Sequence, residues 1–141
     1  MIMIMTENLE VRFKEIKNKI KLAAERAKRN DDEIKLVAVS KTHPSEILRE
    51  ALETGINIFG ENKVQEAEDK ILETGQEKAK WHLIGHLQSN KVRKAAKLFD
   101  VIHTIDSVEL ARRLERICKE EGRPVLSVLI QVDLGGEQTK S

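Results

Sequence analysis

The sequence has no tyrosine, a single cysteine, two prolines and no long apolar run, and its charges nearly cancel. Cys118 cannot form a disulfide within the chain, and its place beside Ile117 in a helical pattern favours buried packing. With 25 lysines and arginines against 24 aspartates and glutamates, the chain lacks the basic field that drives nucleic-acid binding. A nucleic-acid partner is therefore not expected.

The apolar start, residues 1–5, is too short for a secretory signal or for a membrane span of about 20 residues. We therefore expect no membrane partner and a cytoplasmic location. Residues 1–5 themselves are expected to be disordered or to be an extension from an alternative start site.

Helical and strand-like patterns alternate through the rest of the chain. Residues 6–29 carry apolar side chains at steps of three and four, which predicts an N-terminal amphipathic helix. Five short apolar runs follow as expected strands, with helical patterns between them: 35–40, 56–60, 81–84, 100–104 and 125–132. The first run is typical of a strand buried on both faces. Such alternation predicts a parallel α/β sheet, either an open doubly wound sheet or a (β/α)8 barrel.

No linker interrupts these units, so we expect residues 1–141 to form one domain. A barrel needs eight strands, and the patterns provide about the first five. If the fold is a barrel, the domain is incomplete and the chain is truncated at its C-terminal side. Open sheet edges would then favour self-association.

Lys41 follows the first expected strand, at the carboxyl end where barrels and open α/β sheets place their sites. A lysine attacks an aldehyde only as the neutral amine, and desolvation at the end of a buried strand would favour that form. The alternative is an ordinary surface lysine that begins a loop.

Asn62 and His86 come just after the second and third expected strands. Asn62 either presents its amide to a ligand or caps the following helix, with Gln65 as its partner. His86 either lies against a bound aromatic ring or is a hydrogen-bonded loop histidine. Its spacing from His82 suits metal binding only on a helix, so no metal site is expected.

Six ordered segments resemble the pyridoxal phosphate homeostasis family, small proteins that are similar to the barrel domain of bacterial alanine racemase. The segments are AVSKT at 38–42, FGENKVQE at 59–66, WHLIGHLQSNK at 81–91, HTIDS at 103–107, VLIQV at 128–132 and EQTKS at 137–141. The resemblance implies a (β/α)8-type barrel that binds pyridoxal 5′-phosphate as a Schiff base on Lys41. It also places Asn62 and His86 near the cofactor, with Lys140 as a second lysine near the site.

The resemblance further implies a role in intracellular pyridoxal phosphate homeostasis without substrate turnover, and apo forms of pyridoxal-phosphate enzymes as acceptors. The alternatives are a racemase-like enzyme and a ligand-free fragment of the barrel. Alanine racemases use a lysine and a tyrosine as acid–base groups, and the absence of tyrosine counts against the enzyme. The loops that usually hold the phosphate in a barrel follow strands seven and eight, beyond the units expected here.

Overall fold

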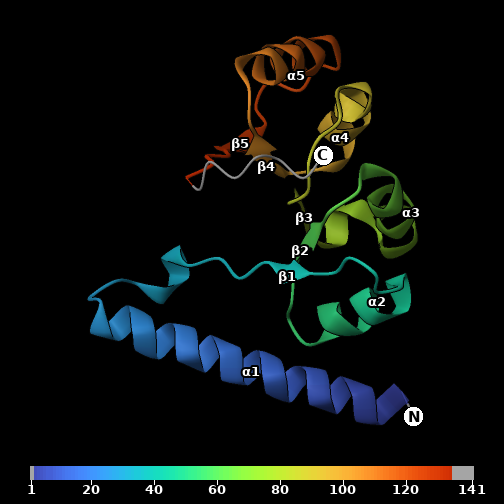
Figure 1. Ribbon diagram of the computed structural model, residues 1–141. Helices are drawn as coiled ribbons and strands as arrows, with labels where there is room; N and C mark the ends of the chain where they lie inside the picture. The colour runs from blue at the N-terminus through green and yellow to red at the C-terminus, as the bar shows by residue number, and fades with distance from the viewer. Residues whose placement is uncertain (1, 135–141) are drawn as a thin grey trace.

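The computed structural model describes residues 2–134, and it describes side chains from residue 8 onward. Strands and helices alternate through this part of the chain (Figure 1). The strands are β1 (Ala38–Val39), β2 (Ile58–Glu61), β3 (Lys80–Leu83), β4 (Val101–Ile105) and β5 (Ser127–Ile130). The helices are α1 (Ile2–Arg26), α2 (Ser45–Glu53), α3 (Val64–Thr74), α4 (Val92–Leu98) and α5 (Val108–Glu120), with three short 3-10 turns, η1 (Asp31–Glu33), η2 (Gln76–Lys78) and η3 (Ser89–Lys91).

The five strands form one parallel sheet in the order β1-β2-β3-β4-β5. Each strand pairs with the next strand in sequence, and a helix crosses between them, as parallel pairing requires. The register sets Val39 opposite Gly60, Gly60 opposite His82, and His82 opposite Val101. The carboxyl ends of all strands therefore lie at the same edge of the sheet.

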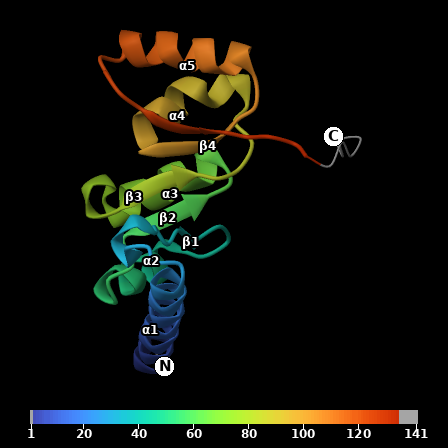
Figure 2. The ribbon, with the colours of Figure 1, turned by 90° about the vertical axis from the view of Figure 1, so that its left-hand side faces the viewer.

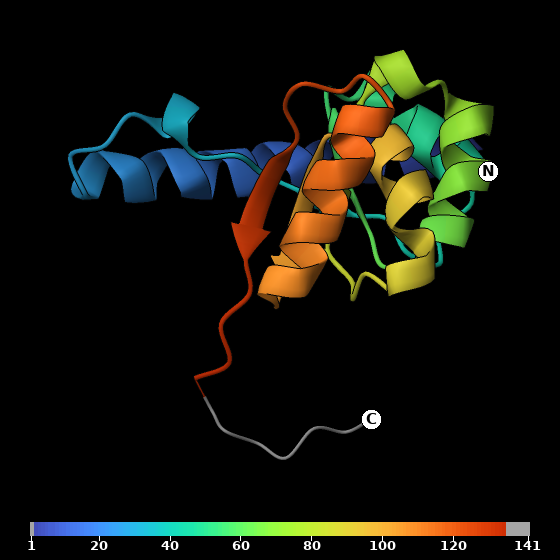
Figure 3. The same ribbon diagram turned by 90° about the horizontal axis from the view of Figure 1, so that it is seen from above.

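Helices α2, α3, α4 and α5 cover one face of the sheet (Figures 1 and 3). Alternate strand residues point towards these helices, because successive side chains of a strand lie on opposite faces. The largest fully buried apolar side chains of this layer are Trp81, Phe59, Phe99, Leu48, Ile71, Leu83, Leu87, Ile102 and Val92. This layer is the hydrophobic core.

The opposite face of the sheet is not covered by the helices α2–α5 (Figure 2). Val39 is 51% exposed on this face, so the expectation that the first strand is buried on both faces is wrong. The inner face of a barrel strand is buried only by the strands across the barrel, and five curved strands do not supply them. β1 is also shorter than the expected run 35–40, with only two residues in the ladder.

The N-terminal helix begins earlier than the pattern indicated. α1 starts at Ile2 and ends at Arg26, so the helix includes residues 2–5. Its residues Leu9 and Phe13 pack against the main core. In the part of the chain that the structure describes, none of the helices has the length and apolarity needed to cross a membrane.

Candidate functional site

Lys41 follows β1 at the carboxyl edge of the sheet. The amide of Ser40 donates to the carbonyl of Gly60 at 3.0 Å, so the hydrogen bonding of β1 with β2 includes Ser40. The paired register ends at Val39 opposite Gly60, and Lys41 follows in a turn. Asn62 follows β2 directly, so both predicted residues lie after strand ends at the carboxyl edge of the sheet.

The side chain of Lys41 is exposed, and it has no hydrogen bond or ion pair within residues 2–134. The expectation that the end of a buried strand desolvates this amine is wrong for the same reason that Val39 is exposed: no strand covers the inner face. Within residues 2–134, this amine is therefore not held by a carboxylate.

Asn62 does not cap the helix that follows it. The N-cap of α3 is Lys63, with no side-chain hydrogen bond, so the capping interpretation of Asn62 with Gln65 is wrong. The side chain of Asn62 makes no hydrogen bond among the described residues. The ligand-binding interpretation of this amide stays a prediction.

Asn62 and His86 line the same hollow, whose volume of about 440 Å³ lies in the size range of small-molecule sites, about 300–1,000 Å³. The residues around it are Asn62, Lys63, Val64, Gln65, Gly85, His86, Gln88 and Lys91. None of them is acidic, and neither Lys63 nor Lys91 has an ion-pair partner in the described part of the chain. The hollow is therefore suited to an anionic ligand. Lys41 is not among its lining residues.

Close packing at Gly85 holds the His86 loop against Asn62. A Cβ at Gly85 would lie 2.1 Å from the carbonyl oxygen of Asn62, a distance that no side chain tolerates. The hydroxyl of Thr104 donates to the carbonyl of Gly85 at 2.7 Å from the other side. His86 itself is exposed, with its Nδ1 3.6 Å from a carboxylate oxygen of Asp106. The glycine therefore fixes the approach of the second and third strand ends.

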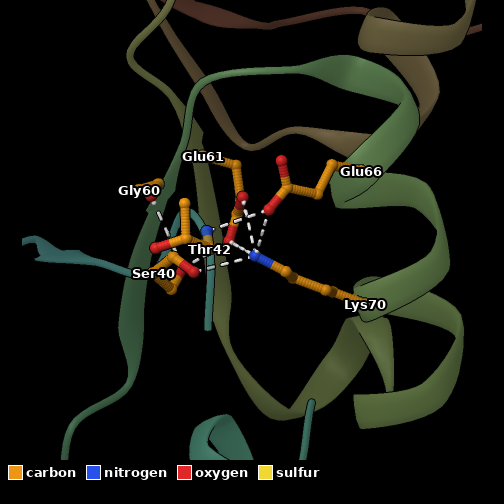
Figure 4. A network of polar contacts seen from close by, with 6 residues as sticks. All are labelled: Ser40, Thr42, Gly60, Glu61, Glu66 and Lys70. Atoms are coloured by element: carbon orange, nitrogen blue, oxygen red, sulfur yellow. Dashed lines mark hydrogen bonds and ion pairs between the residues drawn. The ribbon is translucent and has the colours of Figure 1, made fainter. Parts of the chain in front are cut away.

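A buried polar cluster lies beside Lys41, between β2 and α3 (Figure 4). Its members are Ser40, Glu61, Glu66 and Lys70, and the ammonium of Lys70 contacts the other three. We call this set the Lys70 cluster. This cluster was not predicted from the sequence, although Glu66 and Lys70 have the four-residue spacing of a helical ion pair.

His82 and His103 form a second contact that the sequence did not indicate. Nδ1 of His82 lies 2.9 Å from Nε2 of His103, on the uncovered face of the sheet. Burial lowers the pKa of His82, and the neighbouring His103 lowers it further. A neutral imidazole has one donor and one acceptor nitrogen, so the two rings can share a hydrogen bond that joins β3 to β4. No group of three metal-binding side chains occurs within residues 2–134.

Lys140, the expected second lysine near the site, lies outside the described residues. The described site therefore consists of Lys41, the hollow between Asn62 and His86, and the Lys70 cluster behind them.

Sequence comparisons find relatives along most of the chain. The family model described as alanine racemase, N-terminal domain, matches residues 11–139. A pyridoxal phosphate homeostasis protein of Escherichia coli (strain K12) is 46% identical over 130 residues, which are 90% of this chain and 55% of the relative. The protein of the same name from Vibrio cholerae serotype O1 is 42% identical, over 95% of this chain and 58% of its own length. The chain thus spans about half the length of the curated relatives it matches.

Two solved structures share the fold. PipY of Synechococcus elongatus PCC7942, solved with pyridoxal phosphate bound, is 48% identical with a TM-score of 0.70, over 80% of this chain and 53% of PipY. A protein of unknown function from Bifidobacterium adolescentis has a TM-score of 0.83 at 29% identity, over 96% of this chain and 59% of its own. The five parallel strands and their helices therefore match the N-terminal part of a barrel, and the expected fold class is confirmed.

Proposed function

The chain belongs to the alanine racemase N-terminal domain family, and from that premise we propose that it binds pyridoxal 5′-phosphate through a Schiff base on Lys41. We propose further that it serves intracellular pyridoxal phosphate homeostasis and turns over no substrate. PipY, solved with pyridoxal phosphate bound, supports cofactor binding, and the relatives named pyridoxal phosphate homeostasis proteins support the role in homeostasis.

One observation carries the proposal. An exposed lysine without an ion-pair partner among the described residues follows the first strand at the carboxyl edge of the sheet, the edge where Asn62 follows the second strand. Barrel enzymes place their reactive groups at this edge. An amine tied to a carboxylate would have to break that pair before it could react, and Lys41 does not.

The residues of the site fit the chemical character of pyridoxal phosphate, which has an aldehyde, an aromatic ring and a phosphate. The free amine of Lys41 suits the aldehyde, and the exposed imidazole of His86 suits the ring. The amide of Asn62 offers a donor and an acceptor to ring substituents. Lys63 and Lys91 line a hollow without carboxylates, which suits a ligand of negative charge.

Lys41 would hold the cofactor through its neutral amine, whose nitrogen would replace the aldehyde oxygen in a carbon–nitrogen double bond with release of water. When bound, the cofactor supplies an electron-accepting ring. Asn62 would orient the ring, and His86 would lie against it. The sequence has no tyrosine, which alanine racemases use as one of their two acid–base groups, so we propose that these residues bind the cofactor without moving a substrate proton.

An absorbance titration with pyridoxal phosphate tests the binding. We expect a Schiff-base band in the wild-type chain and its loss in Lys41→Ala. Lys35→Ala is the matched control, because Lys35 is an exposed lysine before the same strand. A Lys41→Ala chain that retains the band would refute the assignment of the site.

The absence of turnover is tested separately with D- and L-alanine. We expect no racemisation above the rate of free pyridoxal phosphate, and steady racemisation at an enzymatic rate would refute this part of the proposal. Transfer of the bound cofactor to the apo form of a pyridoxal-phosphate enzyme, followed by recovery of that enzyme's activity, tests the proposed acceptors.

A further inference from the structure

The Lys70 cluster holds the backbone on both sides of Lys41. The ammonium of Lys70 donates to the carbonyl oxygen of Ser40, the residue before Lys41, at 2.8 Å. The carboxylate of Glu66 accepts from the amide of Thr42, the residue after Lys41, at 3.0 Å. Glu66 and Lys70 are themselves paired at 2.9 Å. One ion pair on α3 therefore grips the peptide groups that flank Lys41 (Figure 4).

The turn held in this way is conformationally unusual. The amide of His43 donates to the carbonyl of Ser40 at 3.1 Å, which closes a turn with Lys41 and Thr42 at its centre. Thr42 has a φ of 68°, in the left-handed region that glycine or asparagine normally occupies. A β-branched residue adopts this conformation only where its surroundings enforce it. The hydrogen bond from Thr42 to Glu66 is such an enforcing contact.

Burial makes the cluster rigid. Glu61 is fully buried and the side chain of Lys70 is 10% exposed. The three N–H donors of the ammonium meet three acceptor groups: the Ser40 carbonyl and the carboxylates of Glu61 and Glu66. The hydroxyl of Ser40 donates to Glu61 at 2.6 Å, which ties the strand end to the same group. All donors of Lys70 are occupied, so this lysine is not a second amine for the aldehyde.

We propose that the Lys70 cluster is a positioning device for Lys41: it fixes the turn that sets the direction in which the reactive amine leaves the sheet. This inference rests on the proposed function, and it goes beyond it by assigning roles to Glu66, Lys70 and Thr42. None of these three touches the cofactor; they act through the backbone of Lys41.

If the cluster only stabilised the fold, removing one of its acids would have the same effect as removing an acid of another ion pair on α3. Glu68 lies on the same helix, two residues from Glu66, and pairs with Lys94 on α4. Its contacts do not include the Lys41 turn. Glu66 and Glu68 therefore form a matched pair of acids, one joined to the turn and the other not.

The test compares Glu66→Ala with Glu68→Ala in the full chain. Pyridoxal phosphate affinity is measured from the Schiff-base band, and the free energy of unfolding is measured without cofactor. We expect Glu66→Ala to weaken binding about tenfold, because the left-handed turn loses its support, while Glu68→Ala binds as wild type. Both variants should differ little from each other in unfolding.

Rescue separates positioning from stabilisation. Thr42→Gly removes the cost of the left-handed conformation, so the double variant Glu66→Ala/Thr42→Gly should recover most of the lost affinity. Borohydride reduction followed by peptide mass mapping should find the cofactor on Lys41 and not on Lys70 in every variant that binds.

The outcomes separate the two proposals. If the wild-type chain shows no band, the proposed function fails and this inference fails with it. If the wild type binds and Lys41→Ala does not, the proposed function stands. In that case Glu66→Ala binding within twofold of wild type, no rescue by Thr42→Gly, or label on Lys70 overturns the positioning role.

Discussion

The two edges of the sheet differ in how their side chains are satisfied. At the β1–β2 end, two buried charged groups are paired: the ammonium of Lys70 lies 2.9 Å from the carboxylate of Glu61, between β2 and α3. At the β5 end, the side chains are apolar and face solvent: Val128 is 42%, Leu129 51% and Ile130 78% exposed. A groove of about 610 Å³ lies beside β5, against α5.

This difference shows which edge of the sheet is stabilised by contacts within the described residues. The first edge needs only α3, whose side chains satisfy the polar groups at the ends of β1 and β2. The last edge leaves apolar surface that requires a neighbour to bury it. The candidate site belongs to the first edge, so its geometry depends on contacts that the described residues already provide.

Removing the ammonium of Lys70 should have the largest effect on the stability of the first edge. Lys70→Met should lower the free energy of unfolding by about 3–5 kcal/mol, because it leaves the carboxylate of Glu61 buried without a partner. Denaturant unfolding measures the change. Lys94→Met, at the surface ion pair with Glu68, is the control and should cost less than about 1 kcal/mol. Equal losses in the two variants would show that the buried cluster has no special importance.

Truncation of a leucine to alanine on the two sides of the molecule should lower the free energy of unfolding by unequal amounts. Leu48 in α2 is 1% exposed, and Leu48→Ala should cost about 2–5 kcal/mol through lost burial and a cavity. Leu129 in β5 is half exposed, and Leu129→Ala should change unfolding by about 0.5 kcal/mol or less. If Leu129→Ala proved as costly as Leu48→Ala, the β5 edge would have to be buried in solution.

The first edge should also respond to acid. The hydrogen bond from Lys70, with that from the amide of Thr42, lowers the pKa of Glu66. The folded state therefore holds this proton less tightly than the unfolded chain. The stabilisation is complete above the ordinary carboxyl pKa of about 4.3 and is lost as the pH falls through the lower folded value.

The measurement is unfolding between pH 6 and pH 3 for wild type and Glu66→Ala. The difference between the two chains should shrink over this range by less than about 1 kcal/mol, because Glu66 is about a third exposed. A difference that is constant down to pH 3 would show that the carboxylate of Glu66 does not act through its charge.

A charge placed on the last edge should have the smallest effect on unfolding and a separate effect on association. Ile130→Lys should change the free energy of unfolding by about 0.5 kcal/mol or less, because the side chain is already exposed. It should reduce self-association in sedimentation, since a lysine on an edge strand opposes pairing between sheets. Undiminished association in Ile130→Lys would place the contact between copies elsewhere.

The periodicity of apolar residues sufficed to predict the elements and their parallel arrangement. In α5, Leu110, Leu114 and Ile117 are buried at the spacing that the sequence displays. The ends were less accurate: the expected run 35–40 contains a strand of only two residues, Ala38–Val39. Element ends are set by individual hydrogen bonds, which an apolar pattern does not record.

The site was predicted in part. Lys41, Asn62 and His86 stand where strand ends place them, because the carboxyl edge of a parallel sheet follows from the order of the elements. Their roles stay predictions. The Lys70 cluster could not be predicted in the same way. The second expected strand ended at Gly60, and a buried carboxylate such as that of Glu61 is rare because burying a charge without a partner is costly. Glu61 is tolerated there only because the side chain of Lys70, nine residues later on α3, reaches its carboxylate.

The order of the strands has a consequence for how this chain is made. Because each strand pairs only with those next to it in sequence, every strand–helix unit can dock on the unit synthesised just before it. Contacts between sequence neighbours close short loops, which favours rapid folding, and the N-terminal units of a nascent chain leave the ribosome first. The turn that carries Lys41 can thus be locked by α3 while later strands are still being translated.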